Sequence, residues 1–372
     1  MAKIEGASDR ISKRRFLKLM GATALAGPAI LHGRLAGAQG RRKVKLGHGI
    51  AVIDPSAASW DSAGNTGGFW QDEGLDVEIL GFNGASPAYH ALLHGEIDVA
   101  MSGSPDLMRL REEDVGVKVI ASVYDRNHAY PAVPIESSIK SIEDFCGKTA
   151  GLQTLTGSPP VWLRTWLQAH NMTMKDLAGA IPVGTGAPAL HALSTGQIDI
   201  LALYHGQYAL FEGEFGLKLR KFDHDPAVVE NAFVQVLVTN EKTIKDEPQM
   251  LAALMRGMAK GIVFADENPK AAARGHYKQF PRTLSPGANI EEAVTKAGNV
   301  IKLSGAISID SARAGQWGMS RPDQIERVRD IMVDGKILNK KLPWQDYYTP
   351  QFIADANKFK IEDVIAKAKA AT

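Results

Sequence analysis

The chain has 372 residues, of which 45% are hydrophobic and 23% are charged, so intrinsic disorder is excluded for most of its length. Its single cysteine, Cys146, excludes an intrachain disulfide framework and a cysteine-rich metal site. Residues 1–38 carry seven basic and two acidic side chains, a net charge of +5, which leaves −3 for the rest of a chain whose total is +2. This negative net charge of the rest of the chain argues against nucleic-acid binding, because that binding depends on neutralising phosphates.

The first forty residues have the pattern of an export signal. The basic segment S-K-R-R-F-L-K (12–18) precedes an apolar stretch at 19–31 and the small residues A-G-A at 36–38. This order is typical of a secretory signal peptide, and the basic pair before F-L-K resembles a twin-arginine signal. We therefore expect export of residues 1–38 by the twin-arginine machinery and a mature, soluble periplasmic chain. No cysteine follows the apolar run, so we expect no lipid anchor.

A twelve-residue segment occurs twice. P-A-Y-H-A-L-L-H-G-E-I-D spans residues 87–98 and P-A-L-H-A-L-S-T-G-Q-I-D spans residues 188–199, and eight of the twelve positions are identical. Each copy predicts a helix that begins at proline, ends at glycine and leads into a short apolar strand. With a strand upstream, each copy is a βαβ unit, so the sequence predicts two similar α/β lobes with largely parallel sheets.

Helix starts recur at the expected ends of strands. Asp54, Ser86, Ser104 and Ser158 each precede a proline, and each follows an apolar segment of the strand type. Loops at the carboxyl ends of strands line the ligand crevice of open α/β sheets. Helix N-termini in such a crevice favour an anion or a strong hydrogen-bond acceptor, although each one also serves as an ordinary helix start.

Two further segments are similar to a known family. Residues 68–78, G-F-W-Q-D-E-G-L-D-V-E, resemble a segment near the start of periplasmic solute-binding proteins for nitrate, sulfonates, taurine and thiamine precursors. Residues 141–151, S-I-E-D-F-C-G-K-T-A-G, resemble the start of that family's second lobe. The resemblance implies an α/β, two-lobed type II periplasmic-binding-protein fold with the ligand cleft between the lobes. It implies a lobe one of residues 44–125 plus 236–372, whose C-terminal segment is helical, and a lobe two of residues 126–235.

By the same resemblance, ligand contacts come from loops of both lobes. The candidates in lobe one are Asp54, Ser59, Trp60, Gly84, Ala85, Ser86, Ser102, Gly103, Ser104 and Tyr124. The candidates in lobe two are Thr156, Gly157, Ser158, Gly184, Thr185, Gly186, Tyr204 and His205. Short side chains suit such loops because they let backbone N–H groups reach an acceptor. The three aromatic candidates fit a core role as well as stacking on a ligand.

The histidines divide into three groups. His48 and His205 fall at predicted strand ends and are binding candidates. Arg126 and His128, just past the first crossover, either pair with a carboxylate or sulfonate of a ligand or are solvated. His90 and His191 share one repeat position, which favours packing over a metal site.

The resemblance implies a binding protein without catalytic residues, cofactor or metal. We expect the solute-binding component of an ABC importer that passes a small organic anion, a sulfonate or a carboxylate, to a membrane permease and its ATPase subunit. A thiamine-precursor pyrimidine is the alternative ligand. A desulfinase or a pyrimidine synthase on the same fold requires a cysteine in the cleft, whereas Cys146 falls at the start of lobe two. We expect the chain to act as a monomer.

Overall fold

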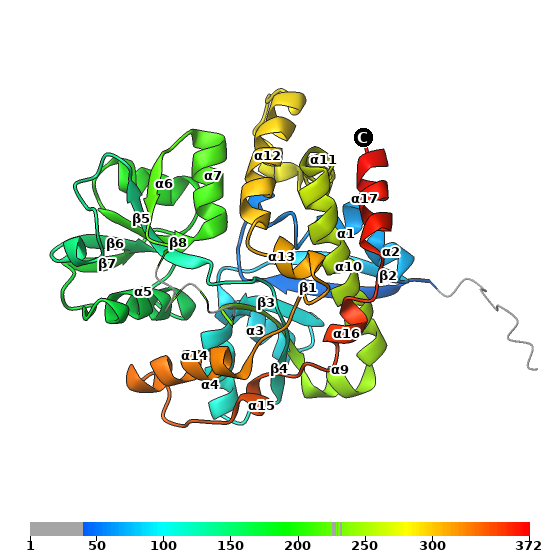
Figure 1. The fold of residues 1–372 in the computed structure, drawn as a ribbon, viewed down its shortest axis with the longest axis horizontal. Coiled ribbons are helices and arrows are strands. Elements are labelled where there is room, and N and C mark those ends of the chain that lie inside the picture. Colours follow the sequence, from blue (N-terminus) through cyan, green and yellow to red (C-terminus); the bar gives the residue numbers. More distant parts are fainter. Residues whose placement is uncertain (1–39, 225–227, 229, 231–232) are drawn as a thin grey trace, which may run out of the picture. The chain divides into compact units, whose positions relative to one another are not determined.

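The computed structural model describes residues 40–224, 228, 230 and 233–372 (Figure 1). The predicted signal peptide lies outside the described residues.

Two five-stranded sheets organise the chain. The first has the order β2-β1-β3-β10-β4 and consists of β1 (Arg42–His48), β2 (Leu75–Gly81), β3 (Val99–Gly103), β4 (Val117–Ser122) and β10 (Gln235–Asn240). The second has the order β7-β6-β8-β5-β9 and consists of β5 (Ala129–Pro134), β6 (Thr149–Leu152), β7 (Gly179–Pro182), β8 (Ile200–Tyr204) and β9 (Leu219–Lys221). We call the parts of the chain around these sheets lobe one and lobe two.

Both sheets have the same topology. Strand β10 is antiparallel to both of its neighbours in the first sheet, and β5 is antiparallel to both of its neighbours in the second. The pairs β1–β2, β1–β3, β6–β7 and β6–β8 are parallel. The chain passes between the sheets twice, after β4 and before β10. This is the two-lobed type II periplasmic-binding-protein fold expected from the sequence, and its two sheets are mixed rather than largely parallel.

Short helices connect the strands. Those of lobe one are η1 (Pro55–Ala57), α1 (Ala63–Thr66), α2 (Phe69–Asp72), α3 (Ala85–Leu93) and α4 (Ser104–Glu112). Those of lobe two are η2 (Glu143–Phe145), α5 (Ser158–Ala169), α6 (Ala187–Ser194) and α7 (His205–Phe215). Helices α3 and α6 come from the two copies of the repeat. The glycine that ends each copy's helix, Gly95 or Gly196, has φ near +70°, a backbone conformation that costs glycine no Cβ clash.

The aspartate of each repeat makes the same two hydrogen bonds in its own lobe. The Asp98 carboxylate accepts the Lys45 N–H at 2.7 Å, and the Asp98 N–H donates to the Lys45 carbonyl. In lobe two the Asp199 carboxylate accepts the Thr149 N–H at 2.8 Å, and the Asp199 N–H donates to the Thr149 carbonyl. Each pair joins the strand that follows the repeat, β3 or β8, to the neighbouring parallel strand, β1 or β6.

The isoleucine of each repeat packs against a glycine of β1 or β6. Ile97 and Ile198 are buried, and a Cβ atom on Gly47 or Gly151 would lie 2.5 Å from the Cδ1 atom of the corresponding isoleucine. Each repeat therefore packs against a strand of its own sheet, and the local packing is the same in both lobes.

The C-terminal third is helical and covers lobe one (Figure 1). It comprises α9 (Glu241–Asp246), α10 (Pro248–Glu267), α11 (Pro269–Gln279), η3 (Pro281–Thr283), α12 (Ile290–Gly305), α13 (Ile309–Arg313), α14 (Pro322–Asp334), α15 (Trp344–Tyr347), α16 (Ile353–Ala356) and α17 (Ile361–Ala370). Helix α10 supplies much of the core that also contains β1 and β3 side chains. No helix among the residues that the structure describes combines the length and the apolar character needed to cross a membrane.

We predict that Ile97→Ala and Ile198→Ala each lower the free energy of unfolding by about 2–5 kcal/mol, because each leaves a cavity against a glycine. The matched control is Leu93→Ala, which truncates a side chain of α3 that is 42% exposed. Urea titrations followed by circular dichroism measure all three. Equal effects of Leu93→Ala and Ile97→Ala would contradict the packing role of the repeat.

Candidate ligand-binding site

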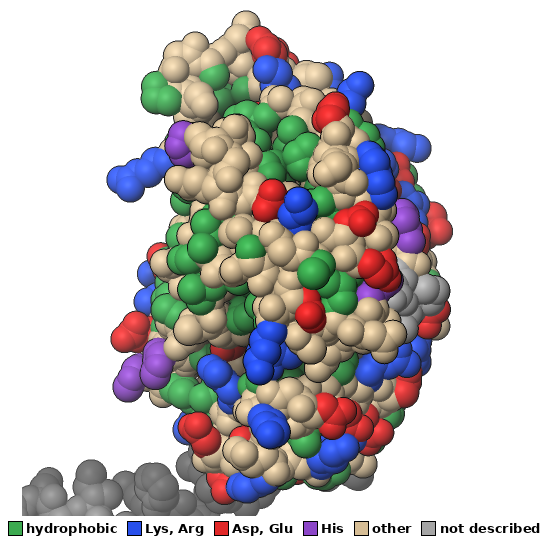
Figure 2. All heavy atoms as spheres, turned by 90° about the vertical axis from the view of Figure 1, so that its left-hand side faces the viewer, with side chains coloured by type: hydrophobic (Ala, Val, Ile, Leu, Met, Phe, Trp, Pro, Cys, Tyr) green, Lys and Arg blue, Asp and Glu red, His purple; other side chains and the backbone are tan. Residues whose placement is uncertain are grey.

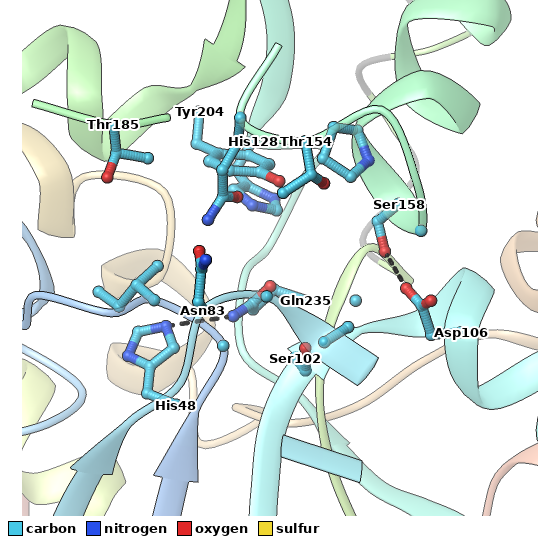
Figure 3. A pocket seen from close by; sticks show the side chains of 18 of the residues that line it. His48, Asn83, Ser102, Asp106, His128, Thr154, Ser158, Thr185, Tyr204 and Gln235 are labelled. Atoms are coloured by element: carbon cyan, nitrogen blue, oxygen red, sulfur yellow. Dashed lines mark hydrogen bonds between the residues drawn. The ribbon is translucent and has the colours of Figure 1, made fainter. Parts of the chain in front are cut away.

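A cavity of about 440 Å³ lies between the two lobes (Figure 3). Its walls are loops that follow β1, β2 and β3 in lobe one and β6, β7 and β8 in lobe two, together with the two crossovers. Figure 3 shows on one side of the cavity His48, Asn83, Ser102 and Gln235, and on the other side His128, Thr154, Thr185 and Tyr204. The volume falls in the usual range for small-molecule sites, roughly 300–1,000 Å³.

Twelve of the residues proposed from the sequence line this cavity. They are Trp60, Gly84, Ala85, Ser86, Ser102, Gly103, Tyr124, Thr156, Gly157, Ser158, Thr185 and Tyr204. His48, singled out as a binding candidate, also lines it. Among the described residues, six of the proposed contacts are not part of the lining: Asp54, Ser59, Ser104, Gly184, Gly186 and His205.

Hydrogen bonds explain three of these six placements. The Ser104 hydroxyl donates to the Phe233 carbonyl at 2.7 Å. The His205 ring lies between the Tyr130 hydroxyl, at 2.6 Å, and the Leu303 carbonyl, at 2.8 Å. Asp54 caps η1 by accepting the Ser56 N–H, and it also accepts a hydrogen bond from Gln207. These side chains fix the walls rather than face the cavity.

Several lining residues were not proposed from the sequence. They are mainly polar and include Ser56, Asn83, Asp106, Arg109, Gln153, Thr154, Gln207 and Gln235. Gln153 and Thr154 directly follow β6, so the strand-end rule already contained a signal for them. Gln235 lies on the antiparallel strand β10, to which that rule does not apply.

A column of four aromatic rings forms one wall. The ring centroids of Trp60 and Tyr124 are 4.8 Å apart, those of Tyr124 and His128 are 4.4 Å apart, and those of His128 and Tyr204 are 5.1 Å apart. The Trp60 Nε1–H donates to the Ser308 hydroxyl at 3.0 Å, which fixes one end of the column. The column joins lobe one to lobe two.

His128 is the neutral member of this column. It is 5% exposed, and its Nδ1 atom has no hydrogen-bond partner in the described part of the chain. Burial lowers the pKa of His128 well below its usual range, because the charged ring would lose its hydration. The His128 ring thus lies between two tyrosines with a buried nitrogen that has no partner among the described residues.

The lobes touch where the N-termini of α4 and α5 meet. The Ser158 hydroxyl donates to the Asp106 carboxylate at 2.8 Å, and the Arg109 guanidinium lies 3.4 Å from the same carboxylate (Figure 3). Burial raises the pKa of Asp106, and the Ser158 hydrogen bond opposes that shift. A Cβ atom on Gly103 would lie 1.9 Å from the Ser158 Oγ atom, so this contact requires a glycine.

Few charges face the cavity. Within the described lining, Arg109 is the one lysine or arginine, and it is 48% exposed and paired with Asp106. No group of three or more His, Cys, Asp or Glu side chains in the described ranges is arranged to hold a metal ion. On the outer face shown in Figure 2, basic and acidic side chains are interspersed. Cys146 is exposed and is not among the lining residues.

The fold and this cavity define a chain that is similar to periplasmic binding proteins. The sequence profile described as NMT1/THI5 like matches residues 62–272, more than half of the chain. The chain therefore belongs to the NMT1/THI5 like family.

Known proteins show what this chain is similar to. It is 26% identical over 207 residues to the formylaminopyrimidine-binding protein of Halalkalibacterium halodurans, an alignment that covers 55% of this chain and 61% of that relative. The chain thus spans about three fifths of that relative's length.

Solved structures share the fold. The alkanesulfonate-binding protein SsuA from Xanthomonas axonopodis pv. citri, bound to MOPS, has a TM-score of 0.60 at 13% identity, with 83% of this chain and 98% of that chain covered. The desulfurization enzyme DSZB has a TM-score of 0.52 at 11% identity, with 85% and 99% covered. Binding proteins and at least one enzyme therefore use this architecture.

We predict that the stability of the protein falls less steeply with acid in His128→Phe than in the wild type. Below about pH 6.5 the unfolded chain takes up a proton at His128 that the buried ring does not, so acid favours unfolding by up to about 1.4 kcal/mol per pH unit for this residue. Phenylalanine keeps a ring in the column and does not titrate. Urea titrations at a series of pH values compare the two proteins, and identical slopes would contradict a neutral buried His128.

Proposed function

We propose that the chain is the extracytoplasmic solute-binding component of an ABC importer and that it encloses a small, neutral, planar heterocycle of the aminopyrimidine class. It releases this solute to a membrane permease driven by an ATPase. The observation that carries the proposal is the aromatic column beside a lining of amides and hydroxyls. Flat faces stack on such rings, and neutral polar groups suit the donors and acceptors of a heterocycle.

The charges of the site favour a neutral solute over the organic anion expected from the sequence. Asp106 lies in the first turn of α4 and accepts the hydroxyl of Ser158, the first residue of α5. This carboxylate thus occupies the positive ends of two helices, where an anionic ligand would otherwise bind. Arg109 is already paired with the same carboxylate. A sulfonate would meet Asp106 without a free cation to compensate.

The comparisons support the same choice. The relative from Halalkalibacterium halodurans is named for binding a formylaminopyrimidine. The similarity to sulfonate-binding structures, at 13% identity for the Xanthomonas protein, concerns the fold. Export by the twin-arginine machinery, a periplasmic location and a monomeric state remain predictions from the sequence, as do the lobe boundaries at residues 125/126 and 235/236.

An enzyme of the desulfinase or pyrimidine synthase type is the rival function. Such enzymes need a cleft cysteine, and the one cysteine of this chain, Cys146, is exposed outside the cavity lining. A binding protein needs no nucleophile. Its ligand closes the lobes because it contacts both of them at once.

Thermal denaturation and isothermal titration calorimetry test the ligand class. We expect 4-amino-2-methylpyrimidine at about 100 times its dissociation constant to stabilise the purified protein by about 2.7 kcal/mol. Propanesulfonate and propionate at the same concentration leave the melting temperature unchanged. Stabilisation by the sulfonate but not by the pyrimidine would overturn the proposed ligand class.

Gly103→Ala tests whether the solute is bound between closed lobes. The added methyl group meets Ser158 across the cleft, so we expect at least a roughly tenfold loss of pyrimidine affinity with little change in ligand-free stability. The matched control is Gly116→Ala in the same lobe, where the nearest atom to the added Cβ lies 3.5 Å away.

A second substitution separates closure from local damage. Ser158→Gly removes the side chain that the Gly103→Ala methyl group meets, so the double variant is expected to regain part of the affinity. Wild-type affinity in the Gly103→Ala variant would show that the lobes do not close at this contact.

A further inference from the structure

A buried carboxylate, Asp61, lies behind an imidazole of the lobe-one cavity wall, His48. Asp61 is fully buried, and its Oδ2 atom lies 2.7 Å from the Nδ1 atom of His48, which is itself 3% exposed. An ionised carboxylate only accepts hydrogen bonds, so the Nδ1 atom of His48 carries the proton. The other carboxylate oxygen, Oδ1, has no hydrogen-bond partner within the described ranges. Asp61 is thus directed at His48 alone.

The second ring nitrogen of His48 faces a residue of the cavity wall. Its Nε2 atom lies 3.3 Å from the side-chain nitrogen of Gln235 (Figure 3). An amide nitrogen donates and does not accept, so this contact requires a bare lone pair on the Nε2 atom. One tautomer of His48, with its ring proton on Nδ1, satisfies both the Asp61 contact and the Gln235 contact.

This tautomer decides which end of the Gln235 amide is offered to a ligand. With the amide nitrogen turned to His48, the carbonyl oxygen lies on the opposite side of the group, and Gln235 lines the cavity. The described residues give the Gln235 side chain no other hydrogen bond, so His48 alone holds this orientation. A freely rotating amide could bind a donor or an acceptor of a ligand equally well. A fixed amide that presents its carbonyl oxygen binds a ligand donor but disfavours a ligand carbonyl, because two acceptors would then face each other.

We propose that Asp61 and His48 are positioning residues that hold Gln235 with its carbonyl oxygen toward the cavity, so that the site selects a heterocycle carrying an amino group there over its oxo analogue. This inference rests on the proposed function and names the part of the site that sets its specificity. The chain of contacts runs from Asp61 through His48 to Gln235, and the last of these touches the ligand.

The test compares affinities for 4-amino-2-methylpyrimidine and for 2-methylpyrimidin-4-one by calorimetry. The wild type is expected to prefer the amino compound at least roughly tenfold. In Asp61→Asn the new amide can donate to the His48 Nδ1 atom, which moves the ring proton to Nε2 and turns Gln235 around. We expect the preference to fall to parity or to reverse.

Nitrogen-15 NMR of His48 in the ligand-free proteins reports the tautomer directly. The wild type is expected to carry the proton on Nδ1 and Asp61→Asn to carry it on Nε2. A wild-type proton on Nε2 overturns the proposal, and so does an unchanged preference in a variant whose proton has moved. The control is Asp125→Asn, which alters a half-buried carboxylate outside the cavity lining and is expected to change neither readout.

His48→Leu decides the outcome if the proton stays on Nδ1 in Asp61→Asn. Leucine removes the lone pair that holds Gln235, so the preference is expected to fall by roughly tenfold in a variant that still melts cooperatively; an undiminished preference overturns the proposal. If the wild type binds neither compound, the proposed ligand class fails, while the NMR measurement still tests the tautomer.

Discussion

The two lobes meet beside the cavity at one close contact, where the N-terminus of α5 reaches the end of β3. Gly103 has no side chain, so the Ser158 hydroxyl comes near the strand and donates to Asp106. That carboxylate is buried in this arrangement of the lobes, and burial of a charge is costly unless donors replace the water. The Ser158 hydroxyl and the Arg109 guanidinium supply part of that replacement. In the function proposed above, a bound solute supplies the remainder, and this would couple binding to closure.

The two copies of the repeat occupy equivalent places in the two sheets, and the lobes differ at positions outside the repeat. Asp98 and Asp199 stabilise their sheets by equivalent hydrogen bonds, Asp98 to Lys45 and Asp199 to Thr149. Lys45 of β1 therefore occupies the same place in lobe one as Thr149 of β6 does in lobe two. In that correspondence His48 matches the buried Leu152. The Asp61–His48 pair therefore exists in one lobe only. Asp98 and Asp199 are shared between the lobes and support the sheets. His48 is not shared, and in the proposal above it sets the ligand specificity.

The sequence predicts the architecture because the features that determine it are local. A proline start, a glycine stop and an apolar strand recur in both copies, and these alone imply two βαβ units. The loops after β1, β2, β3, β6, β7 and β8 were also identified, because strand ends converge in such sheets.

The directions of side chains and the contacts between residues far apart in the sequence were harder to predict from the sequence. Tyr204 and His205 are neighbours, yet Tyr204, the last residue of β8, lines the cavity while His205, the first residue of α7, contacts Tyr130. Gln235 and Asp61 carry no local signal, since their roles depend on contacts with His48 across the fold. We expected an anionic ligand because helix N-termini face the cavity. That expectation did not consider the Asp106 carboxylate, which lies at the N-termini of both α4 and α5.

The central claim is that two lobes close on a small solute, and the distance between their rims measures this most directly. Val52 and Leu155 are exposed residues of the loops that follow β1 and β6, beside the cavity-lining Ile50 and Thr154. Spin labels at Val52→Cys and Leu155→Cys, in a Cys146→Ser background, report that distance by double electron–electron resonance. The account predicts that saturating 4-amino-2-methylpyrimidine shifts the distribution to one shorter distance. The same distribution with and without the pyrimidine would contradict it.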